Sequence, residues 1–207
     1  IGTMDGISYM DYIVPGLIMM SVITNSYSNV ASSFFSNKFQ RSIEELMVSP
    51  LPSWIILLGY IIGGAVRGLG VGIIVTAVAF LFTDLDIHHP FLTIMVVVLT
   101  ALLFSIGGFI NALFARKFDD ISIIPTFVLT PLTYLGGVFY SIHMLPEFWQ
   151  TVSLANPVLY MVNAFRYGLL GVSDIAMWQA FIIIFGFILA LGSFAMWLLA
   201  RGVGIKT

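Results

Sequence analysis

Two runs of polar side chains recur at helical spacing inside otherwise apolar parts of the sequence. The first run carries hydroxyl and amide groups at Ser21, Asn25, Ser28, Asn29 and Ser32. The second carries Thr126, Thr130, Thr133, Tyr134 and Gly137, together with Pro125 and Pro131, which free backbone carbonyls and bend a helix. Because residues three or four apart share one side of a helix, each run forms a stripe. The stripes either line a water-accessible substrate path or hydrogen-bond packed helices to one another, at about 0.6 kcal/mol per contact.

A charged residue, Arg67, lies near the middle of another apolar stretch. Insertion at that depth costs about 2.5–3.5 kcal/mol, so we expect the guanidinium to be buried inside the helix bundle against polar partners. No acidic residue lies at a matching depth, and Asn25, Asn29 or a carbonyl freed by a proline is the expected acceptor. The favoured role is a structural clamp, and the alternative is a contact with substrate. Glycines spaced four apart in the same stretch predict close helix packing; they are Gly59, Gly63, Gly64, Gly68 and Gly72.

The polar segment 38–48 predicts a short amphipathic helix between the first two apolar stretches. Asn37 and Gln40 form a possible capping box at its start, and Pro50 and Pro52 end it. Its apolar side comprises Phe39, Ile43, Leu46 and Met47, and its polar side comprises Lys38, Arg41 and Glu45. Such a helix either rests on lipid or docks into a soluble protein. The adjacent Glu44 and Glu45 favour a protein partner, because helices at an anionic membrane surface prefer Lys and Arg.

The segment 145–171 holds two short helix candidates, neither long enough to span a bilayer. Pro146 suits the first turn of one, with Trp149 on its apolar side, and Asn156–Pro157 is typical of a cap and first helical position for the other. We expect both to be re-entrant in the outer leaflet, with Arg166 bonding the terminal carbonyls of the second. His88, His89 and His143 lie on the same side, and solvated loop positions are a better interpretation of them than metal ligands.

Catalytic and cofactor chemistry finds no support in the sequence. The chain has no cysteine and no Gly-rich loop followed by Lys-Ser or Lys-Thr, so we expect neither a thiolate site nor a bound nucleotide. No apolar stretch carries a carboxylate, which argues against an ion-coupled transporter, and none pairs a serine with a His or Lys for hydrolysis. The net charge of −2 does not suggest a nucleic acid partner.

The elements that position these residues are those of an all-α integral membrane protein, because 59% of the residues are hydrophobic and 9% are charged. Apolar stretches predict membrane-spanning helices at 12–35, 54–82, 91–115, 121–140 and 177–200, within one domain that covers residues 1–207. Basic residues occur in the first and third connections and at the C-terminus, which we therefore expect in the cytoplasm. The N-terminus then lies outside without a signal-like start, so we expect a preceding span in a six-span protein; a five-span protein is the alternative.

Three segments resemble the ABC-2 type permeases of bacteria: KFQRSIEELMVSP, ARKFDDISIIPTFVLTPLTYLGGVFYS and LPEFWQTVSLANPVLYMVNAFRYGLLG. The resemblance covers essentially the whole chain and implies a type V exporter-like permease in the bacterial inner membrane. It also implies a homodimer with two copies of a separate ATPase, which would hold ATP and Mg²⁺. Carried over, residues 38–48 become a coupling helix that enters the ATPase through Phe39, Gln40, Arg41, Ile43, Glu44, Glu45 and Met47.

The same resemblance implies roles for the other groups of residues. The two polar stripes would line the translocation path, and the re-entrant segment would gate its outer end through Pro146, Trp149, Asn156, Pro157 and Arg166. The leading prediction is the non-enzymatic membrane subunit of an exporter of a lipid, glycolipid, polysaccharide or hydrophobic drug. An ATP-independent secondary transporter or channel is the alternative, and a structural membrane protein that tethers another partner is a third reading.

Overall fold

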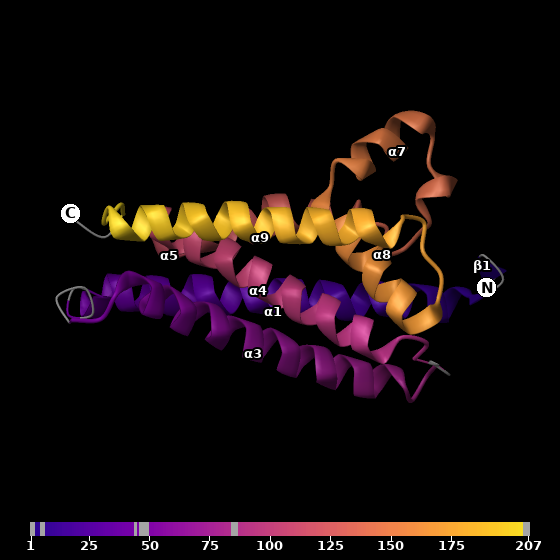
Figure 1. Ribbon diagram of the computed structural model, residues 1–207, viewed down its shortest axis with the longest axis horizontal. Coiled ribbons are helices and arrows are strands. Elements are labelled where there is room, and N and C mark those ends of the chain that lie inside the picture. Colours follow the sequence, from indigo (N-terminus) through magenta and orange to yellow (C-terminus); the bar gives the residue numbers. More distant parts are fainter. Residues whose placement is uncertain (1–2, 5–6, 44, 46–49, 84–86, 205–207) are drawn as a thin grey trace.

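Long helices run side by side along the length of the molecule (Figure 1). The computed structural model describes the chain except residues 1–2, 5–6, 44, 46–49, 84–86 and 205–207. The helical elements in chain order are α1 Tyr9–Phe39, α3 Ser53–Ala79, α4 Pro90–Phe114, α5 Phe118–Ile124, the π-helical turn η1 Pro125–Leu129, α6 Thr130–Tyr134, the 3₁₀ turn η2 Ile142–Met144, α7 Glu147–Leu154, α8 Pro157–Leu170 and α9 Met177–Ala200. Before α1, strands β1 Thr3–Met4 and β2 Ile7–Ser8 pair in antiparallel fashion.

Three of the described helices are both long and apolar enough to cross a membrane. They are α3, α4 and α9, with 27, 25 and 24 residues. The first predicted span lies in α1, which has 31 residues but whose polar stripe lowers its hydropathy. The fourth predicted span, 121–140, is divided among α5, η1 and α6 and ends its regular helix at Tyr134. Of the five predicted spans, three are therefore single apolar helices, one lies in a helix with a polar stripe, and one is divided among shorter elements.

Proline explains why the fourth segment is broken. Pro125 has no N–H to donate to the carbonyl of Ile121, and that carbonyl accepts a hydrogen bond from Nδ2 of Asn111 on α4 at 3.1 Å. The backbone then takes one π-helical turn, in which the N–H of Thr130 bonds the carbonyl of Pro125. Oγ1 of Thr130 bonds the same carbonyl at 2.9 Å. The predicted freeing of a carbonyl by proline is confirmed, and a polar side chain of a neighbouring helix satisfies it.

α1 is the central helix and packs against α3, α4 and α8. Its contact with α3 depends on glycine, because a methyl group at Gly64 or Gly68 would overlap side chains of α1. Gly72 is also close to α1, so the predicted close packing is confirmed for these positions. Gly59 and Gly63 face open space instead, and the prediction is wrong for them.

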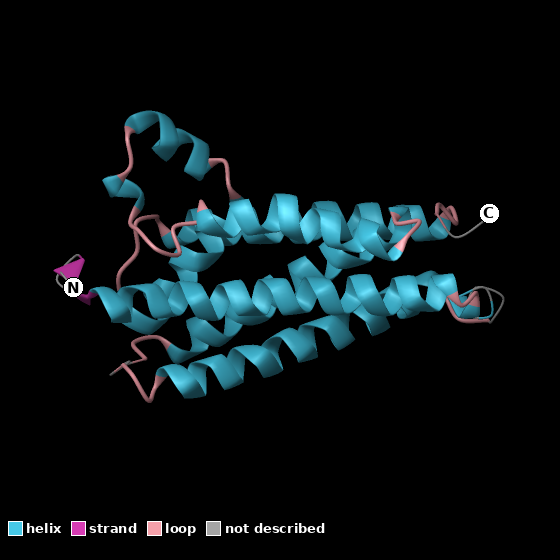
Figure 2. Ribbon diagram, turned by 180° about the vertical axis from the view of Figure 1, so that it is seen from behind, coloured by secondary structure: helices cyan, strands magenta, loops and turns pink. Residues whose placement is uncertain are grey.

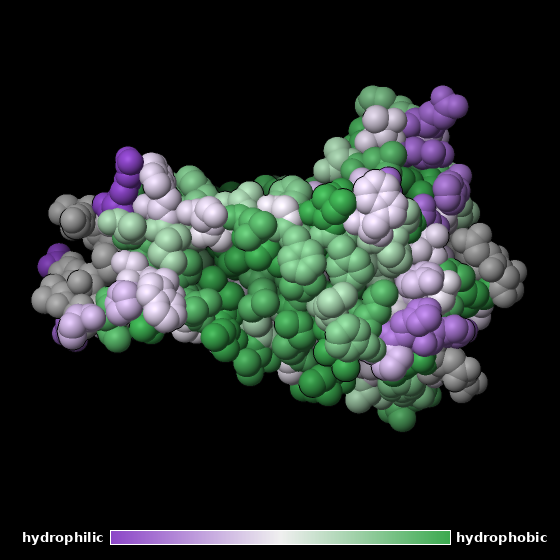
Figure 3. All heavy atoms as spheres, in the orientation of Figure 1, coloured by the Kyte–Doolittle hydropathy of each residue, from purple (hydrophilic) through white to green (hydrophobic). Residues whose placement is uncertain are grey.

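Hydrophilic side chains gather at the two ends of the bundle, and apolar ones cover its middle on the side shown in Figure 3. One end holds the C-terminus, the end of α1 and the turn between α4 and α5 (Figure 1), with Lys38, Arg116, Lys117 and Arg201. The opposite end holds the N-terminus and the connections that lead into α4 and α9. We call the basic end the inner end and the opposite one the outer end, following the expected preference of basic residues for the cytoplasmic side.

Candidate functional site

The first predicted polar stripe lies on a side of α1 that other helices leave partly open. α3 contacts α1, and so do α5 and η1. Figure 2, seen from behind, shows α1 running lengthwise above α3. The stripe residues are half-buried or exposed, and Thr24, which the sequence prediction omitted, is exposed beside them. We call this set the polar face; it comprises Ser21, Thr24, Asn25, Ser28, Asn29 and Ser32.

Most hydrogen bonds of the polar face stay within α1. Oγ of Ser21 donates to the carbonyl of Leu17 at 3.0 Å, and Nδ2 of Asn25 donates to the carbonyl of Ser21 at 2.9 Å. Oγ of Ser32 likewise donates to the preceding turn at 2.7 Å. Bonds of this kind satisfy a polar side chain without a partner helix. Within the described part of the chain, Asn29 is the one polar-face side chain that bonds another helix, so interhelical clamping does not account for the stripe.

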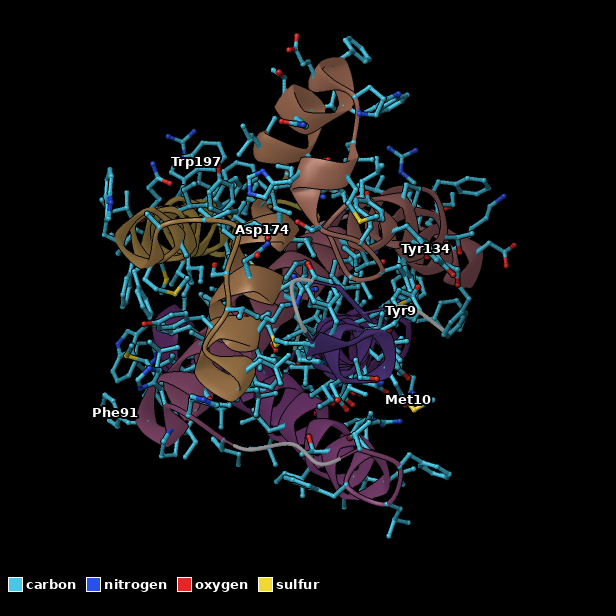
Figure 4. The ribbon with its side chains drawn as sticks, turned by 90° about the vertical axis from the view of Figure 1, so that its right-hand side faces the viewer. Tyr9, Met10, Phe91, Tyr134, Asp174 and Trp197 are labelled. Atoms are coloured by element: carbon cyan, nitrogen blue, oxygen red, sulfur yellow. The ribbon has the colours of Figure 1, made fainter. Side chains whose placement is uncertain are left out.

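The second predicted stripe is split between the surface and the interior. Thr126, Thr130 and Tyr134 are exposed. Thr133 is 1% exposed, and its Oγ1 donates to the carbonyl of Thr130 at 2.8 Å. Thr133 is therefore turned into the protein, and its prediction as a lining residue is wrong. Figure 4 shows Tyr134 and Tyr9 on one side of the bundle, opposite Phe91 and Trp197.

Arg67 projects from α3 beside the polar face and is exposed, which corrects the prediction of a buried intramembrane charge. Its Nη1 donates to Oδ1 of Asn29 at 3.2 Å, so one of the acceptors expected from the sequence is confirmed. The side chain of Arg67 is not buried, because α3 is a peripheral helix that contacts α1 through its glycines. Arg67 lies at the margin of that contact rather than inside it.

α1 continues past Asn37, the first residue of the predicted capping box, to the inner end. Nδ2 of Asn37 donates to the hydroxyl of Tyr60 at 2.6 Å, and Nε2 of Gln40 donates to Oγ of Ser36 at 3.0 Å, so neither residue caps a new helix. The helix ends at Phe39, and the chain then turns at Arg41, whose φ of 62° is left-handed. The predicted start of the amphipathic helix at residue 38 is therefore wrong.

Lys38 joins α1 to the end of α4. Its Nζ donates to the carbonyls of Leu113 and Ala115 at 2.7 and 2.8 Å, which satisfies groups that the end of a helix leaves unpaired. Burial lowers the pKa of Lys38, and the positive charge of Arg116 lowers it further. Lys38 is thus an internal link and does not belong to the partner-facing polar side that the sequence predicted.

An aromatic pair marks the surface of the inner end. Phe39 is 65% exposed and packs edge-on against Phe118 of α5, which is also exposed, with ring centroids 5.3 Å apart. Gln40, Arg41 and Glu45 are exposed around it. Ile43 is buried, so its prediction as a partner contact is wrong; it anchors the segment to the bundle. Glu44 and Met47 lie outside the described residues, so their predicted roles are not addressed.

The predicted outer segment consists of two helices with different surroundings. Asn156 caps α8 by accepting the N–H of Val158 at 3.0 Å, and Pro157 is the first helical residue, as predicted. α8 is largely buried against α1, α4 and α9. α7 leaves the bundle at the outer end and exposes Trp149 (Figure 1). Pro146 precedes α7 as its N-cap residue rather than lying in its first turn.

Arg166 is 1% exposed and ties α8 to two other segments. Its Nη2 donates to the carbonyl of Gly137 at 2.6 Å and its Nε to the carbonyl of Tyr12 at 3.4 Å, while the guanidinium lies 4.0 Å from the centre of the Tyr12 ring. A polar pocket of about 590 Å³ opens beside it, lined also by His143 and Asp174. Arg166 faces α1, and these two carbonyl partners lie outside its own helix, whereas the sequence predicted the terminal carbonyls of that helix.

Two histidines take the role that the sequence assigned to Arg166. The backbone N–H groups of His88 and His89 donate to the carbonyls of Leu169 and Gly168 at the end of α8. The ring of His89 stacks on Tyr167 at 5.2 Å. Across the described ranges of the chain, no group of three His, Cys, Asp or Glu side chains is placed to hold a metal ion.

Sequence reasoning missed Asn111, Tyr12 and Phe118. A single Asn in an apolar stretch, with prolines in the next stretch, is the signal that identifies Asn111 as the partner of a freed carbonyl. Phe118 stands among charged residues in the turn RKFDD, where an isolated aromatic residue indicates a surface contact. Nothing local marks Tyr12, whose partner Arg166 lies 154 residues away.

Known proteins resemble this chain over most of its length. The family model for the ABC-2 type transporter matches residues 1–170. The chain is 55% identical over all of its 207 residues to the inner membrane transport permease YadH of Escherichia coli, and the match covers 81% of that protein. It is 23% identical to nodulation protein J of Rhizobium leguminosarum bv. viciae and 24% identical to that of Rhizobium meliloti. Each of these matches covers 83% of this chain and 66% of the relative.

Proposed function

Because the chain belongs to the ABC-2 type transporter family, we propose that it is the membrane-spanning permease subunit of an exporter driven by a separate ATPase. The observation that carries the proposal is the continuity of α1. One helix bears the polar face and ends in the exposed Phe39 at the inner end. A partner that moves the inner end therefore moves the polar face as one rigid element.

The translocation path would form where two copies of the chain bring their polar faces together. Polar side chains at membrane depth generally face a bundle interior or a water-filled cavity rather than lipid. The side of the bundle shown in Figure 3 is apolar and suits contact with membrane lipid. A twofold axis presents the same surface of each copy to the other. Thr126, Thr130 and Tyr134 would line the edge of the same path.

The ATPase would dock on the inner end, around the pair Phe39 and Phe118 and the exposed Gln40, Arg41 and Glu45. Two ATPase copies would bind ATP and Mg²⁺, and their closure would tilt α1 through this surface. This chain would carry no catalytic site and no cofactor. The C-terminus would lie in the cytoplasm of a bacterium, and α7 and α8 would gate the outer end of the path.

The transported molecule would be hydrophobic or amphipathic, because the path opens between helices that lie in lipid. Lipids, glycolipids with their attached polysaccharides, and hydrophobic drugs all fit this description. An ion-driven transporter is disfavoured, since none of the five predicted spans contains a carboxylate to relay protons or sodium.

Charge reversal at the inner end tests the proposal. The full-length permease is coexpressed with its ATPase, and the Glu45→Lys variant is compared with Glu147→Lys, an exposed glutamate on α7 at the outer end. We expect Glu45→Lys to reduce ATPase copurification at least tenfold and Glu147→Lys to leave it unchanged. Equal copurification and ATP turnover in both variants would contradict docking at this surface.

A further inference from the structure

We propose that Arg67 binds the anionic group of the transported amphiphile, so that the exporter selects substrates with a phosphate, sulfate or carboxylate head. The inference rests on the proposed function, because it places Arg67 beside the path formed by the polar face. It adds a binding residue and a chemical class of substrate.

The position of Arg67 keeps it away from lipid headgroups. It lies near the middle of the 27 residues of α3, about 20 Å of helix axis from either end. An arginine side chain reaches a membrane surface by snorkelling only near the ends of a helix. The guanidinium therefore stays at mid-depth, beside Asn29 of the polar face.

The guanidinium has donors to spare. Arginine carries five N–H donors in a planar fork that suits phosphate and carboxylate oxygens. One of them is bonded to Oδ1 of Asn29 at 3.2 Å, and the described residues of the chain offer the others no further bond. Asn29 is neutral, so it orients the arginine without neutralising it. The exposed remainder of the fork is the part that a ligand can use.

The predicted spans of the chain supply no carboxylate as a counter-charge, and neither do those of a second copy. The five predicted spans contain no Asp or Glu, and Arg67 is their single charged residue. A twofold partner presents the same spans and so adds a second arginine rather than a carboxylate. Two cations beside one path create a positive potential at mid-depth, where low dielectric strengthens their attraction for an anion.

The backbone around Arg67 leaves room for a headgroup. Gly63 lies one helical turn before Arg67 and Gly70 lies almost one turn after it. An added methyl group at either glycine would meet nothing within 4 Å. Unlike Gly64 and Gly68, these glycines do not serve the contact with α1. Because these glycines have no side chain, the space on both sides of the guanidinium is open, and a bulky anionic group can approach its N–H donors.

A pair of amphiphiles that differ in head charge tests the site. The permease–ATPase complex is reconstituted in phosphatidylcholine, and ATPase stimulation is titrated with dodecyl phosphate, with dodecyl maltoside and with inorganic phosphate. We expect dodecyl phosphate to stimulate at a concentration at least tenfold below that of dodecyl maltoside. Inorganic phosphate should not stimulate, because it lacks the apolar tail that enters the path.

Three variants assign the preference to Arg67. Arg67→Gln should abolish the preference for dodecyl phosphate, and Arg67→Lys should retain most of it. Asn29→Asp keeps the arginine but supplies a carboxylate beside it, so it should also abolish the preference; it keeps the test decisive if Arg67→Gln fails to fold. Arg201→Gln, which removes an exposed arginine at the inner end, is the matched control and should behave as the wild type.

The outcomes separate the two proposals. A wild-type complex that couples to its ATPase but shows no preference for dodecyl phosphate overturns the Arg67 site alone. A preference that survives in Arg67→Gln and in Asn29→Asp overturns it as well, as does equal stimulation by inorganic phosphate. A wild-type permease that neither binds nor stimulates its ATPase overturns the proposed function.

Discussion

Replacing Arg166 with methionine should strongly destabilise the fold. The side chain is 1% exposed, and methionine fills similar space without the charge. The variant loses a short bond to the carbonyl of Gly137 at 2.6 Å and a long one to the carbonyl of Tyr12 at 3.4 Å. Bonds from charged donors contribute about 1.5–3 kcal/mol each, and a desolvated cation over an aromatic ring adds about 2 kcal/mol. The ring of Tyr12 lies 4.0 Å from the guanidinium.

Part of that loss is offset, because the variant no longer buries a charge, which costs several kcal/mol per ion. We therefore expect a net destabilisation of about 2–4 kcal/mol, which for a chain of this size lowers Tm by roughly 5–15 °C. The measurement is thermal unfolding of the purified permease in detergent. Arg166→Lys should fall between the wild type and Arg166→Met, since an ammonium keeps the charge but not the planar fork.

Arg201→Met is the matched control for this prediction. Arg201 also lies over an aromatic ring, with its guanidinium 4.4 Å from Trp197, but it is exposed. Its replacement should change stability by less than about 0.5 kcal/mol, as is usual at the surface. If the Tm of Arg166→Met lies within about 2 °C of the Tm of Arg201→Met, the bonds of Arg166 do not stabilise the fold and the reasoning is refuted. A difference of that size corresponds to less than about 1 kcal/mol.

Three further predictions concern packing, a freed carbonyl and pH. Gly68→Ala should lower Tm because overpacking costs about 1–3 kcal/mol, whereas Gly63→Ala, which faces open space, should gain up to about 1 kcal/mol of helix propensity. Asn111→Leu should cost about 1–3 kcal/mol by leaving the carbonyl of Ile121 unpaired, measured by thermal unfolding beside wild type. Backbone N–H groups lower the pKa of the Asp120 carboxyl, so its stabilisation is complete at neutral pH and is lost on acidification through that lowered pKa. Asp120→Asn should therefore show a smaller loss of Tm between pH 5 and about pH 2 than the wild type, and an equal loss would contradict the assignment.

The helices themselves were largely predictable from hydropathy. The ends of α3, α4 and α9 fall within a few residues of the ends of the predicted stretches. A long, continuously apolar stretch forms a helix in lipid, because a helix satisfies its backbone hydrogen bonds within the segment. The division of the fourth stretch was only half visible. Pro125 and Pro131 predicted a bend. The π-helical turn also depends on Thr130 bonding the carbonyl of Pro125 and on Asn111 bonding the carbonyl of Ile121, and the second bond comes from another helix, which local sequence does not reveal.

The candidate site was harder to predict, because periodicity shows which residues share one side of a helix but not what that side contacts. The stripe on α1 was correctly grouped, yet the turn of Thr133 into the interior depends on how α6 meets its neighbours. The inner end shows the same limit. Asn37 and Gln40 have the spacing of a capping box, but Asn37 lies within α1 and bonds Tyr60 of α3, and Gln40 is the residue that follows the end of α1 and bonds Ser36. Local signals of helix ends are overridden when a tertiary partner is better placed.

Sequence reasoning favoured a bonding role within the protein for both Arg67 and Arg166, and the structure separates the two residues. Arg166 is buried against backbone carbonyls and an aromatic ring, which is the environment of a charged residue with a structural role. Among the described residues, Arg67 has one neutral acceptor, and the glycines on either side of it face open space, so contacts with these residues do not account for its charge. Loss of Arg166 should therefore reduce the stability of the protein, whatever the charge of the substrate. Loss of Arg67 should reduce the discrimination between anionic and uncharged substrates. Because a clamp and a ligand site differ in which of these two measurements changes, the pair of variants decides the assignment for each arginine separately.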